Sequence, residues 1–536
     1  MVGVGDYGAP RTLNPFLDGP DTAILDLIAP AVFATGYDID PETRQPVPDV
    51  LERIPTLANG GLSVNTNGTM DVTVRITPGA AWADGMPISA ADLAFTVEKV
   101  MDPALPIRSD LRARYDKIVP GSVRASGSEL TFRMDIDPGV DLLFGLILPA
   151  HVVDGSDFVN DWNETLWVSG GPFMLESYQP GQYLALERNE SYWKVDAATG
   201  ARLPYFDRLV FRFFEPGESA DPRLLRAFQA QELDVAVMAF PRGTVDDYMD
   251  LERDGARVVS APGLAWEQIN FQFGPGNRND ESLNQYVRYR RAVAHAIDHA
   301  VLADERGAYP LLSVLRVYLP DLSEDPWAEY GYDPDETAGL LFSLGEDIGE
   351  DLFAGDGPRL VITTSSDSTA TVTMAGEIVV MLNEAGIGAE LQLEDSALFF
   401  GQTLDNGTWD VAAWKFQGSP GRSGAVAFVE MFDPEGLPFV GSNFFRWGTV
   451  DSLVSDESTA RYAEIVDEIR DTIDPMEIDR LLIEAESLLA SQVVLIPLMV
   501  HEQSGAVIWS NRVTGVTANP AQSELWDVEM WRPPAG

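Results

Sequence analysis

The sequence has no cysteine, four lysines and four histidines among its 536 residues. Without cysteine there is no disulfide framework, no thiol chemistry and no cysteine within this numbering that could carry a lipid. No apolar run approaches the length of a membrane span, so we expect a soluble protein.

Positive charge is scarce, and this narrows the partners that the surface can attract. There are 84 acidic and 36 basic residues, giving a formal net charge of -48. No basic stripe exists that could displace counterions from phosphates, which argues against nucleic acid as a partner and disfavours anionic membranes. We interpret the acidity as a solvated surface, arising from salt adaptation or a solubility bias, rather than as a ligand site.

Length and composition indicate a globular protein of several domains. A chain of this length exceeds one hydrophobic core and predicts two or three domains, and 45% hydrophobic with 22% charged residues suits ordinary cores. The first residues, MVGVGDYGAPRTLNPF, contain neither a basic nor an apolar leader region. We therefore expect either a cytosolic protein or one whose leader, with any lipid anchor, precedes this numbering.

The stretch from Ala80 to Pro103 carries the most local information. The alternation of apolar and polar residues from Asp71 to Thr77 predicts a strand directly before it. Ser89 and Asp92 stand three residues apart, which predicts a capping box at the start of a helix. The helix should end at Asp102, because Pro103 cannot continue it.

These residues resemble the signature of the family 5 extracellular solute-binding proteins, the peptide, nickel and oligosaccharide receptors of ABC importers. The resemblance rests on residues in the order and spacing that the family uses: Trp82, Asp84, Gly85, Pro87, Asp92 and Phe95. A second likeness is Gly170-Gly171-Pro172-Phe173, where we expect glycine to supply the positive φ of a hairpin. A third runs from Arg290 to Asp298, with His299 where arginine is usual.

The resemblance implies an α/β, two-lobed periplasmic-binding-protein-like fold of class II, cluster C, with a small α+β scaffold domain and a two-strand hinge. It covers nearly the whole chain. Lobe I would comprise residues 1–34, 168–264 and 502–536, the inserted scaffold domain 35–167, and lobe II 265–501. The hinge strands would lie at 266–273 and 493–500. In this interpretation the Ala80–Pro103 signature shapes the scaffold and does not contact ligand.

Other local patterns predict individual elements of the two lobes. The strand 359–364, the helix 374–385 and the strand 389–393 form a βαβ unit, whose strands should be parallel. A strand is expected at 409–416. Residues 287–303 predict one continuous helix, and residues 24–33 a short helix broken at Pro30.

No catalytic constellation stands out. His295 and His299 have the i, i+4 spacing of a zinc pair, but Ala296 occupies the position where a zincin has glutamate. No nucleophile elbow, Ser-x-x-Lys pair or phosphate-binding loop is found. We therefore expect no enzyme activity, no metal and no cofactor. A secreted glycoside hydrolase or peptidase remains the alternative from another class, because carboxylate pairs are too abundant to exclude one.

The resemblance places ligand contacts in the loop after Leu13-Asn14-Pro15 and in the segment that follows Asp410. The candidate ligand-binding residues are Asp18, Gly19, Asp21, Trp414, Phe416, Gln417, Ser419 and Arg422. Ser419 stands where peptide receptors carry the aspartate that pairs with the α-ammonium group of a peptide. A neutral hydroxyl cannot supply that charge-assisted bond.

The function implied is that of a substrate-binding subunit of an ABC importer, which captures a solute between two lobes by hinge closure. An oligopeptide is the first expectation, since peptides are the commonest ligands in the family. An oligosaccharide is nearly level, because Ser419 and the aromatic residues Trp414 and Trp447 suit sugars, and Gln417 or Asn443 could bond hydroxyl groups. The expected partners are this small solute and the membrane permease, with an extracytoplasmic, monomeric protein and no nucleic acid.

Overall fold

The computed structural model divides the chain into two compact units. Unit 1 comprises Met1–Pro262 with Glu502–Gly536, and unit 2 comprises Gly263–His501. The chain passes from unit 1 to unit 2 within β12 (Ala256–Phe271) and returns within β17 (Leu495–Trp509). The residues that the structure describes are 1–5, 8–162, 168–214, 222–238, 249–274, 282–322, 324–349, 352, 359–437 and 441–534.

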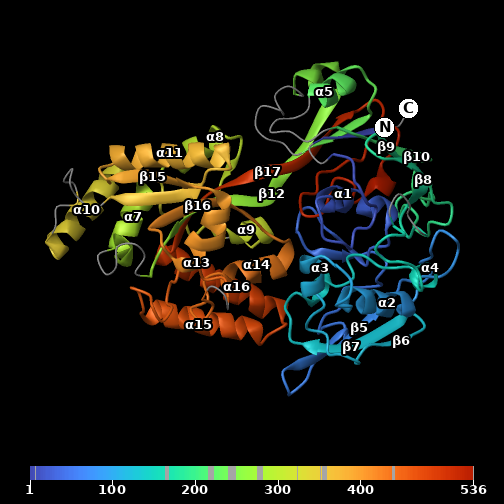
Figure 1. The fold of residues 1–536 in the computed structure, drawn as a ribbon, viewed down its shortest axis with the longest axis horizontal. Coiled ribbons are helices and arrows are strands. Elements are labelled where there is room, and N and C mark those ends of the chain that lie inside the picture. The colour runs from blue at the N-terminus through green and yellow to red at the C-terminus, as the bar shows by residue number, and fades with distance from the viewer. Residues whose placement is uncertain are drawn as a thin grey trace. The chain divides into compact units, whose positions relative to one another are not determined.

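In unit 1 a mixed sheet forms around a short, fully buried strand. This strand, β1 (Val2–Val4), runs parallel to β10 (Arg208–Phe213) on one side and to β11 (Val235–Met238) on the other. The sheet continues from β10 through β9 (Tyr183–Arg188) to β8 (Phe173–Gln179), both antiparallel (Figure 1).

A second, four-stranded sheet lies within unit 1 and carries the capped helix that the sequence predicts. Its order is β4 (Leu62–Val64), β5 (Thr69–Arg75), β7 (Glu129–Asp135) and β6 (Arg124–Ser126). Helix α2 (Ala90–Met101) packs beside β6 and β7. The predicted capping box is confirmed, since Ser89 and Asp92 exchange side-chain and backbone hydrogen bonds at its N-terminus.

The smaller elements of unit 1 complete its framework. They are α1 (Thr22–Val32), β2 (Tyr37–Ile39), β3 (Pro46–Pro48), α3 (Ser109–Ala113), α4 (Ala150–Val153) and α5 (Pro222–Gln229). The prediction of a helix broken at Pro30 was wrong, because α1 continues through this proline. Pro30 lies in the last turn, where its missing N–H costs only one helical hydrogen bond.

Gly170 and Gly171 have a role different from the one predicted. Neither has a positive φ, so the hairpin does not need their conformational freedom. A Cβ on Gly170 would lie 2.8 Å from the Trp82 ring, and one on Gly171 would lie 2.8 Å from the backbone of Val32. These glycines allow close packing between the β8 hairpin, α1 and the Trp82 turn.

A partly buried lysine links distant segments of unit 1 through ion pairs. The Lys194 ammonium lies 2.7 Å from Asp49 and 3.3 Å from Glu529, with Asp38 at 4.0 Å. Burial is the main cause that raises the pKa of the Asp38 carboxyl to about 8, and the negative charge of Asp49 adds to it. Removing one member of such a cluster leaves uncompensated charge, so the four side chains stabilise the packing of these segments together.

Unit 2 contains the predicted βαβ unit, and its parallel pairing is confirmed. Strand β14 (Leu360–Ser365) leads through α11 (Thr369–Glu384) to β15 (Ala389–Glu394), which lies parallel to it. On its other side β14 lies parallel to β16 (Val411–Gln417), which is antiparallel to β12 (Figure 1).

Helices surround the strands of unit 2. They include α7 (Val287–His295), α8 (His299–Asp304), α9 (Leu315–Tyr318), α10 (Pro334–Ile348), α14 (Gly421–Glu430), α15 (Glu457–Arg470) and α16 (Pro475–Ser491). No helix in the described ranges is long and apolar enough to cross a membrane.

The single helix predicted over 287–303 was wrong, since the chain forms α7 and α8 with a break between them. The Asp298 side chain accepts a hydrogen bond from the Val301 amide and caps α8, which competes with continuation of α7. The break separates the two histidines of the candidate zinc pair. The His295 Nδ1 atom lies 2.8 Å from the Gly331 carbonyl, whereas burial lowers the pKa of His299 to about 4.

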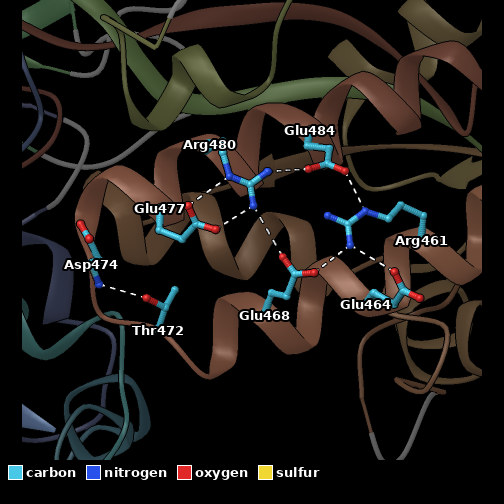
Figure 2. Close-up of polar contacts among 8 residues, drawn as sticks. All are labelled: Arg461, Glu464, Glu468, Thr472, Asp474, Glu477, Arg480 and Glu484. Atoms are coloured by element: carbon cyan, nitrogen blue, oxygen red, sulfur yellow. Dashed lines mark hydrogen bonds and ion pairs between the residues drawn. The ribbon is translucent and has the colours of Figure 1, made fainter.

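An ion-pair network covers the exposed side of the α15–α16 hairpin. Figure 2 shows Arg461 and Arg480 between acidic side chains from both helices. Arg461 pairs with Glu468 and Glu484 at 2.7 Å each, and Arg480 pairs with Glu484 at 2.8 Å. The shared carboxylates join the two helices. The hydrogen bond from Arg461 lowers the pKa of Glu484, and the slight burial of this carboxyl group opposes that effect.

Candidate ligand-binding site

The parallel strands of unit 2 create a topological switch point. The order β15-β14-β16 places successive parallel strands on opposite sides of β14. In open α/β sheets, ligands bind beyond the carboxyl ends of strands at such a point. Here the carboxyl ends of β14 and β16 carry Ser365 and Gln417, and the loops that follow lead into α11 and α14.

Strand β16 presents two different chemical faces at this edge. Trp414 and Phe416 lie on one face, and Lys415 and Gln417 lie on the other, because side chains alternate along a strand. Trp414 is 8% exposed and stacks in parallel with Phe445 at 6.1 Å between ring centroids. Most of the Trp414 ring therefore belongs to the core.

Phe416 is the more accessible aromatic residue and rests on a rigid support. Its ring stacks on Trp266 of β12 at 5.1 Å, with 17° between the ring planes. The Trp266 indole donates a 2.9 Å hydrogen bond to Gln268, whose side-chain amide donates to Asn270 at 2.7 Å. All three supporting side chains are buried, so the stack is held before any ligand arrives.

Tyr318 closes the far side of this aromatic group. Its ring meets Trp266 edge-on at 5.5 Å, and burial raises the pKa of its phenol well above the ordinary value. The helix that carries it, α9, is fixed by Glu486 of α16. The carboxylate of Glu486 accepts hydrogen bonds from the Ser313 hydroxyl at 2.9 Å and the Leu315 amide at 3.0 Å. Burial raises the pKa of Glu486 to about 7.

Glycines are required where the loop after β16 passes this group. A Cβ on Gly418 would collide with the Tyr318 ring, and one on Gly424 would collide with the Ser419 carbonyl. The loop therefore lies directly against Tyr318 and turns into α14. Ser419 is exposed on this loop.

Arg422 already has a structural partner. Its guanidinium makes a bidentate ion pair with Asp479 of α16, with N–O distances of 2.7 and 2.8 Å. This pair joins α14 to α16 across a sequence separation that no local pattern reveals. The pair occupies the Nε and Nη2 atoms of Arg422.

The three remaining predicted residues lie in unit 1. Asp18 and Gly19 are exposed, whereas Asp21 is 9% exposed. The Asp21 carboxylate accepts hydrogen bonds from the backbone amides of Arg11 at 2.8 Å and Thr12 at 3.3 Å. Asp21 thus orders the loop before α1, and the eight predicted site residues fall in two separate units.

Two further side chains suggested for sugar recognition belong to the core. Trp447 is fully buried against Tyr462, and Asn443 is fully buried with its amide donating to the Asp433 and Trp447 carbonyls. Neither side chain can reach a solute. Sequence reasoning did not identify Trp266, Gln268 and Tyr318 as part of the site. For the first two, the available signal was their spacing of two residues, which places both on one face of β12.

Comparison with known proteins places this architecture in a class. The structure resembles the periplasmic EDTA-binding protein EppA over 100% of this chain and 96% of that chain, with a TM-score of 0.71 and 20% sequence identity. It also resembles the unliganded open form of the periplasmic murein tripeptide-binding protein MppA over 99% and 97% of the two chains, with a TM-score of 0.74 and 16% identity. The predicted α/β solute-binding-protein fold is thereby confirmed.

The sequence supports a more specific assignment. Residues 46–433 match the model of the bacterial extracellular solute-binding proteins, family 5, and the chain belongs to this family. The oligopeptide-binding protein OppA of Mycobacterium bovis is 25% identical over 393 residues, which cover 70% of this chain. The match spans 62% of the length of that relative.

Proposed function

We propose that this protein is the substrate-binding subunit of an ABC importer, with an oligopeptide as its ligand. The observation that carries the proposal is the match to family 5, which extends over residues 46–433. The similarity to proteins named for binding oligopeptides and a murein tripeptide favours a peptide. The protein acts outside the cytoplasm as a monomer and delivers its solute to a membrane permease.

In this proposal the loop after β16 is the specificity-determining part of unit 2. Phe416 offers an apolar face supported by Trp266, and Ser419 is exposed beside it. An aromatic face of this kind packs against apolar side chains of a peptide and equally against sugar rings. Because Ser419 lacks the negative charge that would pair with an α-ammonium group, an oligosaccharide is the second candidate.

A thermal-shift screen of short peptides and neutral oligosaccharides distinguishes the two candidates, since a ligand stabilises only the protein that binds it. Stabilisation by peptides alone supports the first proposal, and stabilisation by oligosaccharides alone supports the second. Ser419→Asp should weaken a sugar, because it places an unpaired charge beside neutral hydroxyl groups. Improved sugar binding by this variant would contradict the placement of the site. Chemical turnover of a stabilising ligand during long incubation would contradict a receptor function.

A further inference from the structure

Lys415 is set apart from the other basic residues of unit 2. In the described part of this unit, every arginine side chain has a carboxylate or a backbone carbonyl as a partner. For the exposed Lys415 side chain, no hydrogen bond or ion pair is found among the same residues. The other three lysines of the chain each lie within 4.0 Å of a carboxylate, at 3.9, 3.3 and 2.7 Å.

This lack of a partner is unexpected, because a carboxylate stands directly opposite. Lys415 pairs in register with Glu267 across the antiparallel β12–β16 ladder, a position from which opposite charges can interact. The Glu267 side chain is directed elsewhere. Its oxygens accept a 3.2 Å hydrogen bond from Thr371 of α11 and lie 3.8 Å from the His501 Nε2 atom. Glu267 is therefore engaged by α11 and β17.

Lys415 lies at the edge of the sheet that carries the candidate site. It lies on the same face of β16 as Gln417, at the carboxyl end of the parallel strands. The first turn of the 16-residue helix α11, which begins beyond the same end of the neighbouring strand β14, contains no acidic residue. The carboxylate that contacts this turn is that of Glu267, which accepts a hydrogen bond from the Thr371 hydroxyl. Asp367, in the loop before α11, accepts a hydrogen bond from the Ser396 hydroxyl.

We propose that Lys415 binds a carboxylate group of the ligand at the end of β16, so that the solute of this receptor is an acid rather than a neutral sugar. The inference rests on the proposed receptor function and specifies its ligand class. In a protein with 84 acidic residues, an ammonium group held away from the facing carboxylate is available for a carboxylate that arrives with the solute. A peptide with a free carboxyl terminus and a chelating polycarboxylate share this chemistry.

The test compares Lys415→Met with the wild-type protein in calorimetric titrations. The probes are a pentapeptide with a free carboxyl terminus, the same peptide as its carboxamide, magnesium–EDTA and a neutral pentasaccharide. Lys117→Met is the matched control, because it makes the same substitution and the same change of net charge at a lysine of unit 1 that pairs with Asp137. Melting temperatures of the free proteins report whether any variant loses folding stability.

We expect a carboxylate-bearing probe to bind the wild type and Lys117→Met with equal affinity. The same probe should bind Lys415→Met about 10- to 100-fold more weakly, which corresponds to the loss of one charge-assisted hydrogen bond. The free-acid peptide and its carboxamide should differ for the wild type and bind Lys415→Met equally. Binding of magnesium–EDTA alone would identify a chelate as the source of the carboxylate. Equal affinity of the wild type and Lys415→Met for an acidic probe overturns the inference and leaves the receptor function intact. Binding of the neutral pentasaccharide alone also overturns it. Hydrolysis of a bound probe, detected by mass spectrometry, would instead contradict the receptor function itself.

Discussion

Replacing Glu486 by glutamine tests how the aromatic part of the candidate site is held. Glu486 is 3% exposed and accepts hydrogen bonds from Ser313 and Leu315, which fix α9 and with it Tyr318. Glutamine has nearly the same shape and keeps one oxygen acceptor, but it cannot ionise. The substitution therefore removes the titration of this group and preserves most of its packing.

The size and sign of the effect follow from the pKa. Burial raises the pKa of Glu486 from 4.5 to about 7. Because the folded state has the higher pKa, it binds the proton more tightly than the unfolded state does. The stabilising contribution is complete below the unfolded pKa and is lost as the pH rises through the folded pKa. At 1.36 kcal/mol per pKa unit, the loss between about pH 5 and about pH 8 is roughly 2.5 kcal/mol.

Urea unfolding at closely spaced pH values measures this contribution. Between about pH 5 and about pH 8, the free energy of unfolding of the wild type should fall by roughly 2.5 kcal/mol more than that of Glu486→Gln. Glu484→Gln is the matched control on the same helix, since the pKa of Glu484 is lowered and its side chain stays ionised across this range. Parallel pH profiles for the wild type and Glu486→Gln would refute the argument that burial holds a proton on Glu486.

Three further results are expected. Phe416→Ala should weaken ligand binding about 5- to 10-fold in titration calorimetry, because the aromatic face is lost. The control Phe400→Ala removes a ring that is 48% exposed and should leave the affinity unchanged. Equal effects of the two substitutions would contradict the proposed role of Phe416. Gly418→Ala should lower the free energy of unfolding by about 1–3 kcal/mol, because its Cβ meets Tyr318. The control Gly401→Ala has open space around the new Cβ and should be tolerated. A similar loss of unfolding free energy in both variants would show that the loop does not lie against Tyr318. The melting temperature should rise from low to molar salt, because salt screens repulsion in a chain of net charge -48; flat melting curves would remove the interpretation of the acidity as salt adaptation.

The features that sequence predicted well depend on neighbours in the chain. The capping box at Ser89 and Asp92 involves residues three positions apart, so its geometry can be inferred without knowledge of the fold. The parallel pairing of β14 and β15 follows from the helix that connects them, because neighbouring parallel strands need such a crossover. The family signature identified the fold for the same reason, because its residues build one local turn and helix.

The features that sequence missed depend on contacts made across the fold. The glycine at 170 is required because a Cβ there would meet Ala34 and the Trp82 ring, whereas its sequence neighbourhood suggested the positive φ of a hairpin. The partner of Arg422 is Asp479, which stands far along the chain on another helix. The turn at Asp298 divides a stretch whose apolar spacing suits one helix, because a local cap competes with helix continuation.

The candidate site was predicted in part. The stretch from Trp414 to Ser419 does lie at the carboxyl end of parallel strands, where a ligand site is expected. The supporting residues Trp266 and Tyr318 come from segments that no local pattern connects to β16. Whether the eight predicted residues contact ligand stays a prediction, as does the three-part division of the chain.

The central claim is that this protein binds a solute reversibly and does not transform it. Isothermal titration calorimetry of the purified protein with the peptide and oligosaccharide panel, followed by mass spectrometry of the recovered ligand, tests the claim directly. The account predicts saturable binding of one ligand per chain, with the ligand recovered unchanged. Recovery of a cleaved or otherwise altered ligand would contradict the claim.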